Sequence, residues 1–343
     1  MTEDDLFKKI QDIVNANPVI VLGSGASIGY GIASMSRLSS VLSDYFSKKT
    51  YSDPKCSDAV STFLDNVTTK NMGLEDALLD IHMPMSVENE IRECVWDEIQ
   101  KEDIAVFDRV VAGERLALAE LIDYMIYGRT DQVVEVVTTN YDRIAEYSVS
   151  QTQAYLNTCF TSKPIGIFDI SLQQSKLHSN YIGKVNVLKV HGSLDWFENE
   201  YGLYSFMNVR NKPKDYKPCI ITPGTNKYEK TSQPPYRDLI QQMDLVFKNT
   251  KGFLCIGYGF NDKHVHPNML SYSQNSKKPI LIVTKDITEA IQKKVIDAKA
   301  YPCIIIADNK GKGSIIYNSF DSTSLEIDGK NYWDISGLLE IIK

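Results

Sequence analysis

Residues 133–142 (VVEVVTTNYD) decide the fold class, because a run of β-branched residues stops at a polar cluster that contains Asn140 and Asp142. Residues 185–193 (VNVLKVHGS) repeat the pattern and reach His191. Residues 19–27 (VIVLGSGAS) form a third apolar run, which ends in a glycine-rich loop. In an open α/β sheet, buried strands are apolar runs and ligands bind at their carboxyl ends. We therefore expect the three strand ends to frame one nucleotide pocket.

The composition is that of a soluble globular protein. The 343 residues, 43% hydrophobic and 24% charged, suffice for one large or two ordinary domains. No apolar run reaches the roughly 18 residues of a membrane span, and the acidic N-terminus does not resemble a signal peptide. Six cysteines without Cys-x-x-Cys spacing predict neither a zinc knuckle nor a disulfide framework, so we expect a cytoplasmic protein. The net charge of −7 argues against direct nucleic-acid binding.

Helical spacing dominates the long segment after the first apolar run. Leu38, Leu42 and Phe46 recur at intervals of four, and Leu74 and Leu78 do the same further along. We predict a helical insertion subdomain at about residues 34–130. We interpret it as a scaffold or a contact between subunits rather than as a second active site.

Strands and helices alternate from Val133 onward, which predicts a mostly parallel sheet. The expected strands are 133–137, 185–190, 220–221, 253–257, 280–284 and 304–307. The expected helices are 143–150, 237–249, 264–272 and 287–299. The fold class is therefore α/β, with a Rossmann-like sheet, helices on both faces and the helical insertion. We expect one domain over residues 1–310, followed at 311–343 by a short hairpin and helix appendage.

The loop at residues 23–27 has the residue types of a phosphate-binding turn. Its glycines allow a backbone to approach a pyrophosphate, and the next helix would offer free N–H groups. The third glycine falls at Gly29 rather than at Ile28, so the loop departs from the dinucleotide fingerprint. An ordinary tight turn explains the same residues. Gly257 and Gly259, directly after another strand, predict a second loop that faces a nucleotide.

Two polar residues at strand ends each have two interpretations. Asn140 can hydrogen-bond a ribose hydroxyl or a carboxamide, or it can cap the helix that follows. A neutral imidazole at His191 can take a proton from a substrate hydroxyl near pH 7, although a lone histidine is more often structural. Residues 262–266 (DKHVH) suggest a metal site only weakly, because His264 and His266 would face apart on a helix.

Four loops in this order resemble the sirtuin-like superfamily, and in particular its bacterial branch of NAD hydrolases in anti-phage defence. They are residues 23–27 (GSGAS), 138–142 (TTNYD), 191–193 (HGS) and 256–262 (IGYGFND). Each motif alone is weak, but four in the right order, each at a strand end, make a fairly specific set. The resemblance spans about residues 18–310, so residues 1–310 would form a sirtuin-like NAD-binding catalytic domain.

The resemblance implies NAD as the substrate and gives each loop a role. Asn140 would bind the nicotinamide ribose and position the attacking water, with Asp142 supporting the nicotinamide side. His191 would act as general base on a ribose hydroxyl. The pyrophosphate would be held by the glycine loop, which consists of Gly23, Ser24, Gly25, Ala26 and Ser27. The adenosine end would be lined by Gly257, Gly259 and Asn261.

Departures from the deacylase sirtuins favour water as the acceptor. Thr139 stands where deacylases carry Gln, and residues 31–35 (GIASM) lack their Phe-Arg pair. The two Cys-x-x-Cys pairs that bind zinc after the His-Gly motif are missing, which predicts a chain without a zinc module. Cleavage of an N-glycosidic bond needs an oriented water and charge stabilisation, and it needs no metal.

We therefore expect an NAD glycohydrolase that produces nicotinamide and ADP-ribose, as an effector of abortive infection. Two alternatives stay open: a deacylase or ADP-ribosyl transferase acting on protein, and a subunit that binds NAD or ADP-ribose without turnover. A depletion enzyme must be silent until triggered. We thus expect a homo-oligomer, or a partner such as a DNA-translocating ATPase or a nucleic-acid-guided protein. The sequence does not identify the activating trigger. It also does not distinguish hydrolysis of NAD from cyclisation of ADP-ribose.

Overall fold

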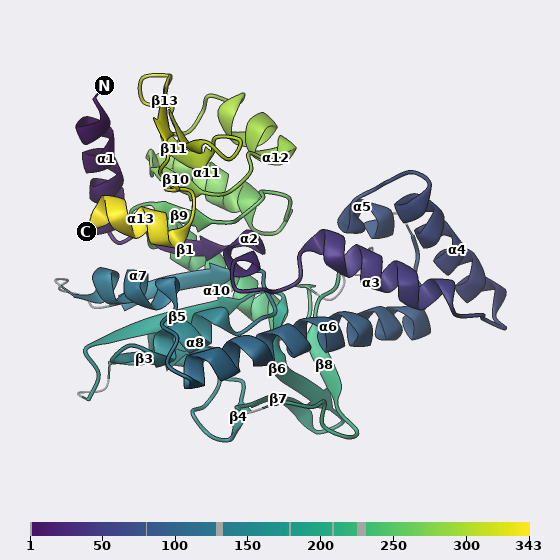
Figure 1. The fold of residues 1–343 in the computed structure, drawn as a ribbon. Helices are drawn as coiled ribbons and strands as arrows, with labels where there is room; N and C mark the ends of the chain where they lie inside the picture. Colours follow the sequence, from purple (N-terminus) through teal and green to yellow (C-terminus); the bar gives the residue numbers. More distant parts are fainter. Residues whose placement is uncertain (1, 80, 128–132, 178–179, 208, 225–230) are drawn as a thin grey trace.

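A nine-stranded sheet forms the centre of the computed structural model, which describes all residues except 1, 80, 128–132, 178–179, 208 and 225–230 (Figure 1). The strand order is β13-β12-β11-β10-β9-β1-β2-β5-β3. Seven neighbouring strands are parallel, and β12 and β13 add an antiparallel hairpin at one edge. The strands are β1 (Val19–Leu22), β2 (Val133–Thr138), β3 (Ala154–Asn157), β5 (Gly183–Lys189), β9 (Phe253–Ile256), β10 (Ile280–Val283), β11 (Cys303–Asp308), β12 (Gly313–Asn318) and β13 (Thr323–Asp328).

Helices cover both faces of this sheet, as the sequence predicts, because successive side chains of each strand point to opposite faces. In β1, Ile20 and Leu22 belong to one buried cluster, and Val19 and Val21 belong to the other. The first cluster is closed by α1 (Glu3–Asn15), α7 (Ala117–Ile126), α8 (Ile144–Ser150) and α13 (Ile335–Ile342). The second is closed by α10 (Tyr236–Asn249), α11 (His266–Ser276), α12 (Glu289–Ile291) and the π-helical turn η2 (Gln292–Ile296).

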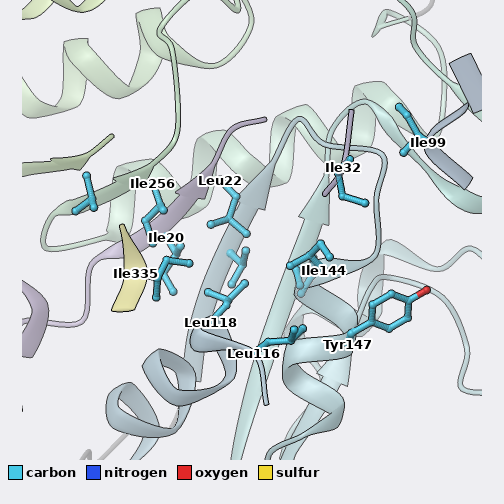
Figure 2. Close-up of a cluster of buried hydrophobic side chains, with 14 of the residues drawn as sticks. Ile20, Leu22, Ile32, Ile99, Leu116, Leu118, Ile144, Tyr147, Ile256 and Ile335 are labelled. Carbon is cyan, nitrogen blue, oxygen red and sulfur yellow. The ribbon is translucent and has the colours of Figure 1, made fainter. Parts of the chain in front are cut away.

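The first buried cluster is continuous from the sheet into the predicted insertion. Figure 2 shows Ile20 and Ile256 of neighbouring strands beside Ile335 of α13, with Ile32 and Ile99 further along. Ile99 lies on α6 (Met85–Val111), which is 27 residues long. One hydrophobic core therefore joins the sheet to the insertion, so the two share their stabilisation.

Within its described residues, the predicted insertion consists of helices joined by loops and contains no strand, and its helices have two different positions. Its helices after α2 (Gly25–Ile28) are α3 (Met35–Ser47), α4 (Pro54–Thr68), α5 (Leu74–Leu79), α6 and α7. Figure 1 shows α3, α4 and α5 extending to one side, while α7 packs against β2 and α8. The last three residues of the predicted range, 128–130, lie outside the described part of the chain. The insertion thus forms a side lobe, with α3, α4 and α5, and it also supplies α7 to the helices that cover the central sheet.

A second sheet of four antiparallel strands corrects one prediction. Its order is β4-β7-β6-β8, from β4 (Ile165–Ile167), β6 (Gly192–Asn199), β7 (Gly202–Phe206) and β8 (Lys217–Ile220). Residues 220–221 were expected as a strand of the parallel sheet, but Ile220 pairs antiparallel with Gly192. A short apolar run does not reveal which sheet it joins. Helix α6 contacts β6 and β8, so this sheet connects the side lobe to the core.

Two predicted helices have different bounds, for local reasons. The helix expected at 264–272 begins at His266, since the Asp262 carboxylate accepts a hydrogen bond from the His264 N–H and holds a turn there. The helix expected at 287–299 is the short α12, capped by Thr288, followed by η2. Every helix in the described part of the chain is too short or too polar to span a bilayer.

The hairpin of β12 and β13 lies at the expected place near the C-terminus. It pairs with β11 of the central sheet, and α13 contacts α1 on the same face. The side chain of Gln11 donates a hydrogen bond to the Ile341 carbonyl at 2.7 Å. The division of the chain at about residue 310 stays a prediction.

Candidate functional site

A cavity opens at the carboxyl ends of β1, β2 and β9. The chain leaves β1 toward β2 and leaves β9 toward β10, on opposite sides, so a crevice forms between the two strand ends. Eight residues predicted for the site line this cavity: Gly23, Ser24, Ser27, Asn140, Asp142, His191, Gly259 and Asn261. The predicted residues Gly25, Ala26 and Gly257 do not line it.

The glycines that do not line the cavity hold its two glycine loops together. The Gly25 N–H donates to the Gly257 carbonyl at 3.0 Å. A Cβ on Gly257 would lie 2.1 Å from the Ala26 nitrogen, and one on Gly23 would lie 2.5 Å from the Gly257 oxygen. Gly257 also has a φ of +56°, a conformation that favours glycine. The sequence motif of glycines therefore reflects backbone contact between the loops, in addition to access for a ligand.

Replacing Gly257 with alanine is expected to separate these loops. The positive φ alone costs roughly 1–2 kcal/mol for a residue with a Cβ, and the backbone clash adds to this. We expect a lower melting temperature by thermal unfolding. Gly259→Ala is the matched control, since its Cβ would meet nothing closer than the Asn261 Nδ2 at 3.5 Å. Equal melting temperatures for the two variants would contradict the contact.

Asn140 is fixed by its amide nitrogen. Nδ2 donates to the Gly23 carbonyl at 2.9 Å and to the Ser27 hydroxyl at 3.1 Å, while its backbone N–H donates to the Thr138 hydroxyl. These partners set the orientation of the carboxamide, because the Gly23 carbonyl can only accept a hydrogen bond and must therefore face Nδ2 rather than Oδ1. Among the described residues, both side-chain hydrogen bonds of Asn140 use Nδ2, which leaves Oδ1 to accept from a ligand or water.

The alternative interpretation of Asn140 as a helix cap is wrong. Helix α8 begins at Ile144, and Arg143 occupies its N-cap position without a side-chain cap. Asp142 makes the nearest equivalent contact, because its Oδ1 accepts from the Ile144 N–H at 3.1 Å. Burial raises the pKa of the Asp142 carboxyl above its ordinary value, although nearby Lys189 opposes this.

His191 lies at the turn between the two sheets. Its backbone carbonyl accepts from the Ile221 N–H at 2.8 Å, and Gly192 after it has a φ of +87°. The imidazole Nε2 lies 3.0 Å from the Asp262 Oδ2, and both side chains are only 7% exposed. A buried imidazole beside a carboxylate can hold a proton in a fixed direction. Sequence reasoning did not predict Asp262 as a site residue, since 71 positions separate it from His191.

The insertion supplies part of the cavity wall. Glu75 of α5, Met35 and Leu38 of α3, and Ile99 of α6 all line it. Glu75 is a carboxylate close enough to Tyr141 to contribute, after burial, to the raised pKa of that phenol. The insertion therefore contributes to the predicted site, in addition to the predicted role as a scaffold or a contact between subunits. No local signal marks Glu75, because only tertiary packing brings α5 to the strand ends.

A buried ion pair holds the segment that follows Asn140. The Asp103 carboxylate of α6 accepts from the Arg143 backbone N–H at 2.7 Å and from its guanidinium at 2.6 and 2.9 Å. Tyr147 also donates to it at 2.6 Å. Burial alone would lower the pKa of Arg143, but Asp103 raises it above its usual value. Beside this cluster, Lys189 pairs with Glu146 at 3.0 Å and donates to the Asp142 carbonyl.

The positive charge of Lys294 argues against the weak hypothesis of a metal site at residues 262–266. Lys294 Nζ lies 3.2 Å from the Nε2 of His266, and burial together with Lys294 lowers the pKa of that histidine. A cation at this distance disfavours a metal ion. Within the described residues, no group of three metal-ligating side chains gathers.

Comparison with known proteins found a family model that matches part of the chain. Residues 134–300 match the family model of the SIR2-like domain, a match that begins in β2 and leaves out β1 and the whole insertion. Over these residues the chain is similar to the SIR2-like domain family. A comparison with curated proteins found no match.

Solved structures with a similar fold include several Sir2 proteins. One is a Sir2 homolog–NAD complex, which is 11% identical over 85% of this chain and 86% of its own, with a TM-score of 0.44. Another is Sir2Tm bound to a propionylated peptide, which is 14% identical over 82% of this chain and 88% of its own, with a TM-score of 0.42.

Proposed function

We propose that this protein is an NAD glycohydrolase, which cleaves the nicotinamide–ribose bond with water to give nicotinamide and ADP-ribose. The observation that supports it most is the common cavity of Asn140 and His191, in which Asn140 turns its nitrogen to the Gly23 loop. The family match supports a nucleotide substrate. The cavity lies where doubly wound sheets bind nucleotides.

The chemistry needs few groups, and the cavity has them. The C–N bond breaks with its electron pair leaving on nicotinamide, and positive charge develops on the ribose. Asn140 Oδ1 would accept a hydrogen bond from the attacking water or a ribose hydroxyl and so orient it. His191 would take the proton that is released. Glu75 supplies a negative charge in the same cavity, where it would stabilise the developing cation.

The apolar part of the lining suits this reaction as well. Ile32, Leu38, Ile99 and Ile221 line the cavity together with the polar groups. Such side chains limit the entry of bulk water. The exclusion of water strengthens each electrostatic interaction inside the site.

The test is nicotinamide release from NAD by the purified protein, with products separated by chromatography. We expect nicotinamide and ADP-ribose from the wild type. For His191→Ala we expect the rate to fall by about a hundredfold or more, because general-base catalysis contributes at least this much. His82→Ala is the control, since His82 is exposed and does not line the cavity.

Other outcomes would contradict the proposal. Nicotinamide release only on addition of an acylated peptide would indicate a deacylase. NAD binding without release would indicate a binding subunit. A cyclic product would replace hydrolysis by cyclisation.

We further propose that this activity serves anti-phage defence by depleting NAD, in an assembly of several copies or with a partner protein. The resemblance of the four loops supports this role. In infected cells the measurement is the NAD pool, which should fall with the wild type and not with His191→Ala. An unchanged pool in both would remove the defence role while leaving the chemistry intact.

A further inference from the structure

We propose that Asp262 is a positioning residue for His191: its carboxylate holds the imidazole at Nε2 and stabilises the ring once it has taken a proton. The inference rests on the proposed function for its catalytic consequence. Its structural part stands on the 3.0 Å contact between Asp262 Oδ2 and His191 Nε2.

Asp262 is itself held in place by its own loop. Its Oδ1 accepts from the His264 N–H at 2.8 Å, and its backbone carbonyl accepts from the His266 N–H at 3.2 Å at the start of α11. These bonds leave the second carboxylate oxygen directed at His191. The side chain is 7% exposed, so water screens the pair weakly.

The pair joins segments from opposite halves of the sheet. His191 follows β5, Asp262 follows β9, and β1 and β2 lie between these strands. The carboxylate is therefore supplied across the mouth of the cavity rather than by a neighbour in sequence. Closing the cavity and orienting the base would depend on the same contact.

The contact has a chemical consequence for the ring. Asp262 Oδ2 lies at ion-pair distance from Nε2, and a carboxylate there favours a proton on that nitrogen; in this proposal the neutral imidazole carries its proton on Nε2 and its lone pair on Nδ1. When His191 takes a proton from a substrate hydroxyl or from water, the imidazolium forms beside a negative charge. A buried carboxylate of this kind orients the histidine and stabilises its charged form without itself becoming protonated.

Asp262→Asn tests this role, because it keeps the shape of the side chain and removes the charge. We expect kcat for nicotinamide release to fall tenfold to a hundredfold, as for other residues that orient a functional histidine. KM should change little, and so should the melting temperature. Asp244→Asn on α10 is the control, since Asp244 bonds Asn268 and Tyr272 away from the cavity.

Nitrogen NMR of the His191 ring is a second readout, which does not depend on activity. We expect the wild-type ring to carry its neutral-state proton on Nε2, and Asp262→Asn to show a smaller imidazolium fraction at the same pH. The other titratable groups that line the cavity are unchanged in this variant, namely Glu75, Tyr141, Asp142 and Tyr258. The difference therefore reports on Asp262.

The two readouts separate the possible failures. A wild type that releases no nicotinamide, both as the purified protein and in infected cells, would overturn the proposed function, while the NMR still tests the pair. A proton on Nδ1 in the wild type would overturn the positioning role, even if the variant did not fold. An active wild type with unchanged kcat in Asp262→Asn would overturn it too.

Discussion

Replacing Asn140 with alanine is expected to abolish nicotinamide release, with a fall of about a thousandfold. Removal of one group that stabilises a transition state costs a hundredfold to a thousandfold, and misplacement of nearby groups adds to this. On the proposed function Asn140 would contribute in both ways, because its Oδ1 is available to the substrate side and its Nδ2 holds Gly23 and Ser27. Rates of nicotinamide release at saturating NAD measure the effect.

Asn268→Ala is the control for this prediction. Asn268 lies exposed on α11, where its amide donates to Asp244 at 3.0 Å, and it does not line the cavity. Wild-type activity is expected for it. An Asn140→Ala protein that keeps its rate would show that other groups orient the attacking water, and it would contradict the catalytic role assigned to Asn140.

Replacing Asp103 with alanine is expected to destabilise the protein more than any other substitution considered above. Asp103 is fully buried, and it accepts from Arg143 and Tyr147. Its loss leaves the Arg143 guanidinium buried without its counter-charge. Breaking a buried pair in this way costs about 3–5 kcal/mol. The midpoint of urea unfolding measures the change in stability.

The same helix offers a matched control. Asp108 of α6 also pairs with an arginine, Arg210, at 2.6 Å, but both side chains are more than half exposed. Exposed pairs are screened by water and contribute little. We expect Asp108→Ala to keep the wild-type midpoint within a small margin. Equal losses in the two variants would show that burial does not determine the strength of these pairs.

The parallel sheet could be predicted from the sequence because its strands are buried on both faces. β1, β9 and β10 are apolar at every position, so their runs stand out without knowledge of the partner strand. The second sheet gave a weaker signal. β4 has exposed residues on both sides of a buried glycine, and β6 mixes Asp195 and Glu198 with apolar residues. Their pairing depends on contacts that no local pattern expresses.

Most of the predicted site residues come together, for a similar reason. Parallel strands place their carboxyl ends at one edge, so loops after β1, β2, β5 and β9 meet whatever their order in the chain. Glu75 and Asp262 could not be assigned in this way. Glu75 reaches the cavity through the packing of the side lobe, and Asp262 through a turn whose direction depends on its own hydrogen bonds.

The position of β1 in the middle of the sheet sets an order of events during synthesis. Ile20 pairs with Val136 on one side and with Leu254 on the other, so the first strand made is completed only by strands far later in the chain. Contacts between such distant segments form slowly. A translation product released before residue 257 lacks Tyr258, Gly259 and Asp262, which form one wall of the cavity. Chains that stop before this point would therefore lack a finished pocket, which requires β9 and the loop after it.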